Sequence, residues 1–227
     1  MSVRTIAAVA IAVASFGAHA ESWFQFEAGA GFAKYEDRGD GTWQQWGAPG
    51  NTTNMKAPIL TAGITGPIIT RGKWGVDWHA DYQFIGTSSA SCMCTITDEN
   101  YDNRAHKIVE NIPNMPLEQY NGHGHTQGLS LMVEPYYMVR GFRVGVLAGL
   151  FLNVPTWHET VTQVPGTQFQ SVAVASRHTI NLGQTVGVSV SRGNFSVRYQ
   201  YFKLPYYGNP FPPIFKGAHT VSLIYKF

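Results

Sequence analysis

The last ten residues of the chain, Ala218–Phe227, constrain the fold more than any other stretch. Every second side chain, counted back from the end, is aromatic or aliphatic: Phe227, Tyr225, Leu223 and Val221. The opposite face holds the polar residues Lys226, Ser222 and Thr220, together with Ile224 and Ala218. A period of two residues is the period of a β-strand. This stretch is therefore predicted to be a strand that ends on its most hydrophobic residue.

That terminal pattern resembles the closing strand of bacterial outer-membrane β-barrel proteins. In such proteins the barrel-assembly machinery reads the last strand. The resemblance implies an assembly signal formed by four residues: Val221, Leu223, Tyr225 and Phe227.

The first residues of the chain indicate export. Arg4 precedes an apolar run from Ile6 to Gly17, and Ala18-His19-Ala20 places small residues where a signal peptidase cleaves. The apolar run is shorter than the about 18 residues that a membrane helix needs. We expect residues 1–20 to be a cleaved secretory signal peptide and residues 21–227 to form one outer-membrane β-barrel domain.

Composition narrows the class further. Charged residues make up only 13% of the chain, and aromatic residues make up the same share. Globular proteins carry about 25% charged residues, so this chain has too few charges for an ordinary solvated surface and too many aromatics for disorder. The formal net charge of +2 gives no electrostatic reason to expect nucleic-acid binding.

Eight segments alternate apolar and polar side chains with the strand period. Their ranges are Trp23–Lys34, Ala57–Ile68, Trp74–Phe84, Leu129–Val139, a segment from Phe142 towards Thr162, a segment that includes Asn181 and ends at Arg192, Phe195–Lys203, and Ala218–Phe227. One face of each is continuously apolar, whereas the other holds Gly, Ser, Thr and single charged groups. We therefore predict an all-β, eight-stranded, antiparallel up-and-down transmembrane barrel.

Connection lengths alternate between long and short along the chain. The three short ones are built on Arg-Gly pairs: Arg71-Gly72, Arg140-Gly141 and Arg192-Gly193. Glycine accepts the positive φ of a tight hairpin, so these are predicted to be periplasmic turns. Residues 36–56 and 86–128 lack periodicity and are predicted to be long extracellular loops.

Aromatic residues gather at the predicted strand ends. Trp74, Phe142 and Phe195 each follow a short turn, and Phe227 ends at the same level. We expect them to form one interfacial girdle. A second girdle is expected from Tyr82, Phe84, Trp157, Tyr206 and Tyr207.

The polar faces carry an unusual set of ionisable residues for a membrane segment. They are Glu27, Asp77, His79, Asp81, Glu134, Arg143 and Arg198, with Lys226 near the rim. A functional interpretation is a proton or ion path, and a structural one is a salt-bridged plug. We favour the plug, because an eight-stranded barrel is only wide enough for its own side chains and unpaired charges there are costly.

A cluster of soft and borderline metal ligands lies within residues 86–128. His123 and His125 are weak candidates for a metal site, together with Cys92 and Cys94, and His106 lies in the same stretch. The two cysteines are separated by one residue. An exported protein meets an oxidising compartment, which favours a disulfide, whereas the strain of so small a ring opposes it. We expect neither a metal nor another cofactor.

The segment Arg177–Gly183 resembles the H-x-S-N-x-G stretch of the PagL lipid A deacylase family, which are eight-stranded barrels with a lipid-facing Ser and His. His178, Asn181 and Gly183 match that stretch, whereas Ile180 stands where the nucleophilic Ser would be. Isoleucine cannot attack an ester. The sequence therefore predicts no enzyme and no catalytic residues, with a lipid-modifying enzyme or a narrow channel as alternatives.

Strand number, turn pattern and terminal Phe227 together resemble the small outer-membrane proteins of the OmpX/Ail/Lom and OmpA-barrel kind. The resemblance implies a bacterial outer-membrane location, with membrane lipid and lipopolysaccharide as neighbours. It also implies a non-enzymatic role in adhesion, surface interaction or envelope integrity. A host or surface ligand is expected to bind through residues 36–56 and 86–128.

Overall fold

A computed structural model describes residues 23–37, 52–94, 101–102, 107–108, 118–163, 172–205 and 215–227. The described ranges consist of β-strands joined by turns. Within them, no helix reaches the length and apolarity that a membrane-crossing helix requires. The proposed signal peptide, residues 1–20, lies outside the described residues, as do His106, Tyr206 and Tyr207.

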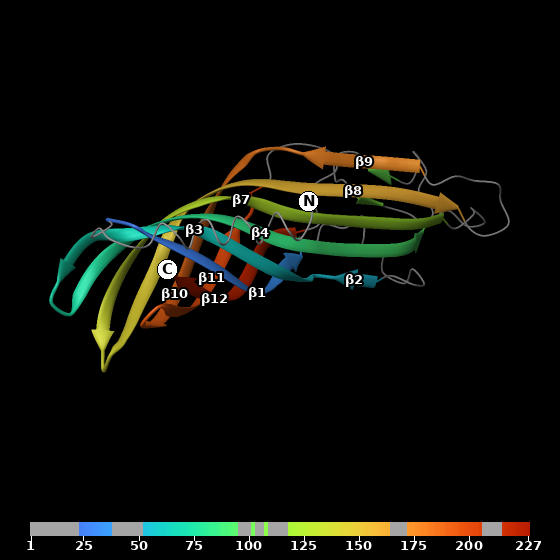
Figure 1. Ribbon diagram of the computed structural model, residues 1–227. Helices are drawn as coiled ribbons and strands as arrows, with labels where there is room; N and C mark the ends of the chain where they lie inside the picture. The colour runs from blue at the N-terminus through green and yellow to red at the C-terminus, as the bar shows by residue number, and fades with distance from the viewer. Residues whose placement is uncertain are drawn as a thin grey trace, which may run out of the picture.

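Eight antiparallel strands close into a barrel (Figure 1). They are β1 (Gln25–Asp37), β3 (Lys56–Arg71), β4 (Trp74–Cys94), β7 (Glu118–Val139), β8 (Phe142–Gln163), β10 (Asn181–Arg192), β11 (Phe195–Lys203) and β12 (Phe215–Lys226). Each pairs with its neighbour in the chain, and β12 pairs with β1 to close the ring. The predicted eight-stranded up-and-down barrel is confirmed, and the ring leaves no barrel strand unpaired in the membrane.

Three two-residue turns join the strands at one end of the barrel, which we call the turn end. Gly72, Gly141 and Gly193 all have positive φ, at 56°, 83° and 57°. Arg140 also has a positive φ of 50°, because it occupies the turn itself between the paired residues Val139 and Phe142. In the other two turns the arginine is the last strand residue, paired with Trp74 or Phe195.

The outer wall of the barrel is apolar, and the interior holds both polar and apolar side chains. Along β10 the exposed and buried residues alternate without interruption. A band of exposed aliphatic side chains surrounds the barrel, and we call it the lipid belt: Leu60, Leu129, Leu131, Val146, Leu150, Val186, Val188, Val197, Val221 and Leu223. A surface of this kind is stable in hydrocarbon and not in water.

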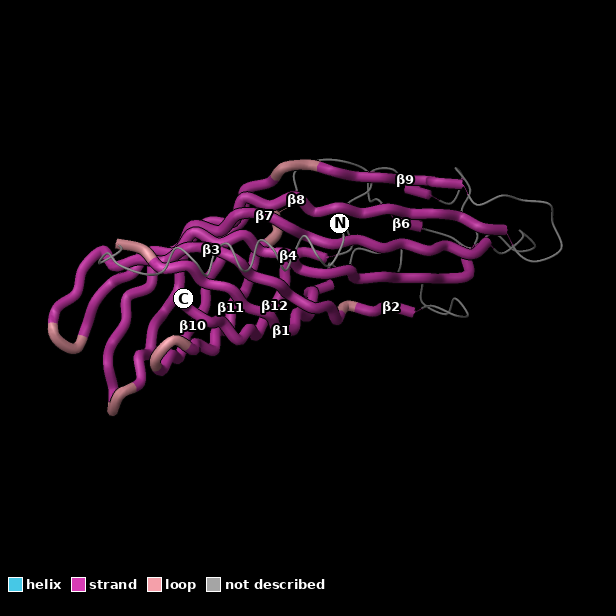
Figure 2. The backbone as a smooth tube through the Cα atoms, viewed as in Figure 1, coloured by secondary structure: helices cyan, strands magenta, loops and turns pink. Residues whose placement is uncertain are grey.

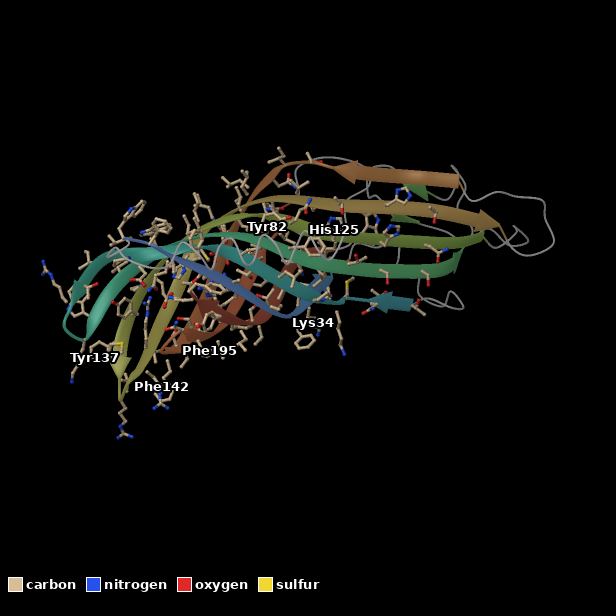
Figure 3. All side chains as sticks on the ribbon, in the orientation of Figure 1. Lys34, Tyr82, His125, Tyr137, Phe142 and Phe195 are labelled. Carbon is tan, nitrogen blue, oxygen red and sulfur yellow. The ribbon has the colours of Figure 1, made fainter. Side chains whose placement is uncertain are left out.

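Exposed aromatic side chains gather at the turn end, as Tyr137, Phe142 and Phe195 do in Figure 3. Phe195 packs edge-on against Tyr225, and Tyr225 packs against Phe227, with ring centroids 5.0 Å apart in each pair. The predicted second girdle is wrong at Trp157, because this side chain is 1% exposed and points into the barrel. Tyr82 is exposed and donates a hydrogen bond to Gln127.

Three strands continue well beyond the lipid belt. β4 has 21 residues and β7 and β8 have 22 each, about twice the 9 to 11 that a tilted membrane strand needs. They stay paired to their far ends, where Cys94 lies opposite Glu118 and Glu118 lies opposite Gln163. β2 (Thr52–Asn54) adds to β4 and β9 (Val172–His178) adds to β8. Figure 2 shows this projecting sheet extending away from the barrel.

The prediction of one long aperiodic loop over residues 86–128 is therefore wrong at both of its ends. β4 runs through this stretch to Cys94, and β7 begins at Glu118. Two short antiparallel strands of two residues each, β5 (Tyr101–Asp102) and β6 (Lys107–Ile108), lie between them in the chain. Likewise β1 extends to Asp37, and β2 and the start of β3 fall within residues 36–56. Outside the membrane the strands no longer need one apolar face, so their sequence loses the contrast that marks them.

Candidate functional site

The turn-end half of the barrel interior holds a network of charged side chains. Arg198 on β11 is 1% exposed and lies at its centre. It donates hydrogen bonds to both carboxylate oxygens of Glu27, at 2.9 and 3.1 Å, and to Asp81 at 2.9 Å. Strands that are remote in sequence thus bring two carboxylates onto one guanidinium. This pairing offsets part of the cost of burying the three charges.

A second centre forms around His79 and Glu134. The His79 ring lies 3.1 Å from Glu27 Oε1 and 2.7 Å from Glu134 Oε2, so it bridges the two acids. Glu134 also accepts a hydrogen bond from Ser189 at 2.8 Å. Arg143 binds Asp77 at 2.6 Å and approaches Glu134 at 3.1 Å. Its guanidinium carbon also lies 3.7 Å from the centre of the Tyr136 ring.

Glycines on neighbouring strands make room for these charges. A Cβ atom at Gly63 would lie 2.1 Å from Asp81 Oδ1, and one at Gly145 would lie 2.3 Å from Glu134 Oε1. At Gly63 the Ala80 backbone oxygen, 2.5 Å from such a Cβ atom, also blocks a side chain, whereas a Cβ atom at Gly145 would force the Glu134 side chain to move. These two glycines of the polar face are thus packing partners of the charged residues.

All seven predicted interior residues lie on the inner wall, and each contacts another member of the set. Glu27, His79 and Asp81 bring one ligand atom each within 4.8 Å of the others, a spacing that could hold a metal ion. Arg198 already binds both carboxylates of this trio. The residues present therefore fit a fixed protein cation rather than a metal.

The other half of the interior is filled with apolar side chains, which sequence reasoning missed. Its largest buried members are Tyr35, Ile59, Ile85, Phe151, Trp157, Phe202 and Phe215. The Tyr35 hydroxyl lies 2.9 Å from the carbonyl oxygens of Ile85 and Gly86 and accepts a hydrogen bond from the Thr126 amide at 3.1 Å. Extending the two-residue period of the first strand beyond Lys34 would have placed Tyr35 inside. We call this cluster the aromatic plug.

The predicted metal candidates lie on the projecting sheet and not in one cluster. His123 is exposed on β7, with its ring centroid 5.5 Å from that of His158 on β8. His125 lies beside the Phe84 ring, and its ring nitrogen is 2.9 Å from the Thr156 hydroxyl. The backbones of Cys92 and Cys94 belong to β4, and their side chains lie outside the described part of the structure. Among the described residues, these histidines join no set of three close metal-ligating groups.

The segment that resembles the deacylase stretch spans the junction of β9 and β10. Ile180, at the nucleophile position, is 69% exposed on the outer wall. Asn181 points inward, and its carbonyl accepts a hydrogen bond from the Asn153 side chain at 3.2 Å. A Cβ atom at Gly183 would lie 2.3 Å from the Lys203 carbonyl oxygen. Asn181 and Gly183 therefore have structural roles here, and the His178 side chain lies outside the described residues.

Comparison with known proteins finds similarity of fold at very low sequence identity. No family model matches the chain, and no curated protein sequence matches it. The chain is similar to the attachment invasion locus protein Ail of Yersinia pestis, solved with the heparin analogue sucrose octasulfate. That match has 11% identity, a TM-score of 0.38 and covers 90% of this chain and 97% of Ail. It is also similar to the outer-membrane protease OmpT of Escherichia coli, with 9% identity, a TM-score of 0.47 and coverage of 93% and 99%.

These matches are too distant to carry an argument about activity, and one is an enzyme while the other is an attachment protein. The assignment therefore depends on the molecule itself: the closed ring of eight strands, the exposed lipid belt, the aromatic girdle and the charged interior. The chain is a small eight-stranded transmembrane β-barrel of the outer-membrane type.

Proposed function

We propose that this barrel is a non-enzymatic bacterial outer-membrane protein that presents its projecting sheet to bind a ligand at the cell surface. The turn end faces the periplasm and the projecting sheet faces outward. We further propose insertion by the barrel-assembly machinery and a surrounding of membrane lipid and lipopolysaccharide.

The projecting sheet carries the proposal. Its outer face is polar, although it continues directly from the lipid belt, and it displays Ser89, Asn121, His123, His158 and Thr160. Ser91 at its edge hydrogen bonds Thr52 of β2 at 2.6 Å. Ordered strands outside the membrane do not stabilise the barrel's contact with lipid, so their length needs another explanation. A rigid polar platform suits recognition, because it loses little conformational entropy when a ligand binds.

The barrel interior favours a binding role over transport or catalysis. The aromatic plug fills one half of the lumen and the charge network fills the other. At the outer wall, Ile180 offers no nucleophile. Incubation of the refolded protein with outer-membrane lipids is expected to leave their mass spectrum unchanged, and a deacylated lipid product lost in His178→Ala would contradict a non-enzymatic role.

A shortened barrel tests the binding role. Ser88 and Gly124 are paired residues, so residues 89–123 can be removed and the two strands joined through an Asn-Gly turn. The carbonyl and amide partners of Tyr35 remain in this variant. Cells that display it should keep a heat-resistant folded barrel and lose adherence to host cells and matrix proteins.

A matched control removes several of residues 206–214, which belong to the connection between β11 and β12. Adherence should survive in the control. Equal adherence by the full-length protein and by the variant lacking residues 89–123 would contradict the proposal.

A further inference from the structure

An apolar groove of about 660 Å³ lies on the outer wall of the barrel, across β11, β12, β1 and β3. Its apolar walls are formed by Phe32, Pro58, Tyr199 and Val221. These residues come from strands that meet at the closing seam, where β12 pairs with β1. The groove has the size of a small-molecule site, and it opens towards the lipid rather than towards the lumen.

A row of basic side chains borders this groove. Lys34 on β1 lies directly opposite Lys56 on β3 and directly opposite His219 on β12. Directly opposed like charges destabilise a sheet, since their Cβ atoms are only about 5 Å apart. In the described part of the chain, neither lysine lies within ion-pair distance of a carboxylate. Glu36, two residues further along β1, is bound instead to Tyr201 at 2.9 Å and Lys216 at 3.2 Å.

The charged side chains inside the barrel differ from these two lysines. Each carboxylate and guanidinium of the described charge network contacts an opposite charge, as Arg198 does with Glu27 and Asp81. The two lysines are exposed beside an apolar surface, and no carboxylate among the described residues pairs with them. Two neighbouring ammonium groups repel each other less when one anion binds both, so this arrangement is complementary to a doubly charged phosphate.

The position of Lys34, Lys56 and His219 along the barrel indicates which molecule carries the phosphate. Phe32 and Val221, two residues nearer the turn end than Lys34 and His219, belong to the exposed apolar wall. Lys34 projects from the barrel at the opposite end of this wall from Phe195 (Figure 3). With the turn end in the periplasm, the lysines stand at the outer boundary of the membrane. Lysines at such a boundary extend their ammonium groups to the headgroup level.

We infer that this groove binds a phosphorylated lipid of the outer leaflet. The phosphate lies between Lys34 and Lys56, and an acyl chain lies along Phe32, Pro58 and Val221. Tyr199 and His219, which hydrogen bond to each other at 2.8 Å, form the rim beside the headgroup. Free phosphate would leave the apolar walls unused, so the ligand is the lipid itself. The inference requires the proposed membrane orientation and does not depend on a ligand of the projecting sheet.

Native mass spectrometry of the refolded protein in a neutral detergent tests the site. Diphosphoryl lipid A should bind, whereas dephosphorylated lipid A and inorganic phosphate should bind at least tenfold more weakly. The Lys34→Gln/Lys56→Gln variant should lose at least tenfold in affinity for diphosphoryl lipid A. The matched control, Arg71→Gln/Lys73→Gln, removes two positive charges at the turn end and should bind as the wild type does.

Unfolding temperature in the same detergent gives an independent readout. Without lipid, Lys56→Gln should match or exceed the wild type, because a like-charge contact is removed. Diphosphoryl lipid A should raise the midpoint of the wild type and leave that of the double variant nearly unchanged. Equal binding of both forms of lipid A, or equal losses in the double variant and its control, would overturn the inference. Retained lipid binding in the variant lacking residues 89–123 would separate this site from the projecting sheet.

Discussion

At the scale of single residues, charge burial sets the strongest requirements. The two-residue period of the strands predicted which ionisable side chains face the lumen, because successive residues of a strand point to opposite sides. It did not predict which of them pair. Arg198 meets Glu27 and Asp81 only because three strands are staggered so that these residues share one level. That stagger is a property of the closed ring and is not encoded in any one strand.

Removal of the Arg198 side chain should therefore lower the stability of the folded barrel. Arg198→Met leaves Glu27 and Asp81 buried without their cation, and the loss of unfolding free energy should be about 3–5 kcal/mol. Urea-dependent loss of the heat-resistant gel band, or of tryptophan fluorescence, measures it in lipid vesicles. The matched control is Arg192→Met at the exposed end of β10, where only a contact with the Phe142 ring is lost and the change should stay within about 1 kcal/mol. Equal midpoints for the two variants would refute the structural role of the network.

A second residue-level prediction concerns Glu36 at the outer rim. Its pKa lies below the ordinary value of 4.5, first because the Tyr201 hydroxyl hydrogen bonds to it and then because Lys216 lies beside it. A lowered pKa in the folded state contributes stability that is present above pH 4.5 and is lost as the pH falls through the folded value. Glu36→Gln should therefore flatten the acid side of the stability profile. Superimposable profiles for wild type and variant would argue against this contribution.

At the scale of strands and turns, the membrane-embedded elements were the predictable ones. In lipid one face must be apolar, so the two-residue period is strong from Trp74 to Phe84 and over Phe195–Lys203. The extensions of β4 and β7 escaped prediction because both of their faces are polar or small, as at Ser88 and His123. Trp157 was misassigned for a related reason: an aromatic near a strand end can belong to a girdle or to a plug. Only the strand pairing distinguishes the two.

The closing strand gives a prediction at this scale. The Phe227 amide donates a hydrogen bond to the Phe26 carbonyl at 2.9 Å, and its ring packs on Tyr225. Phe227→Asp places a charge in the aromatic girdle and in the proposed assembly signal, so the yield of folded barrel in cells should fall severely. Lys226→Ala, one residue away, should fall much less. The heat-modifiable gel band of isolated membranes reports the yields, and equal yields would contradict a special role for the last residue.

At the scale of the whole molecule, buried side chains pack the lumen. The charged side chains fill the half of the lumen at the turn end, and the aromatic plug fills the half farther from the turn end. The refolded protein in a planar bilayer should therefore show no discrete conductance steps. A Trp157→Ala/Phe215→Ala variant, which removes two of the largest plug residues, should be less stable and leak intermittently. Stable steps from the wild type would instead support the narrow channel.

The pairing of β12 with β1 brings the first and last strands of the barrel together, so the strands can keep their places in the ring when the chain starts at a different one. Residues 26 and 227 are hydrogen-bonded neighbours, so a short linker could join the ends and new ends could be opened at the Arg140-Gly141 turn. Such a circular permutant would keep every pairing of the barrel while making β7 its final strand. If the permutant refolds in detergent yet fails to insert in cells, then β12 is needed at the end of the chain as an assembly signal, and its position in the chain is not needed for the fold.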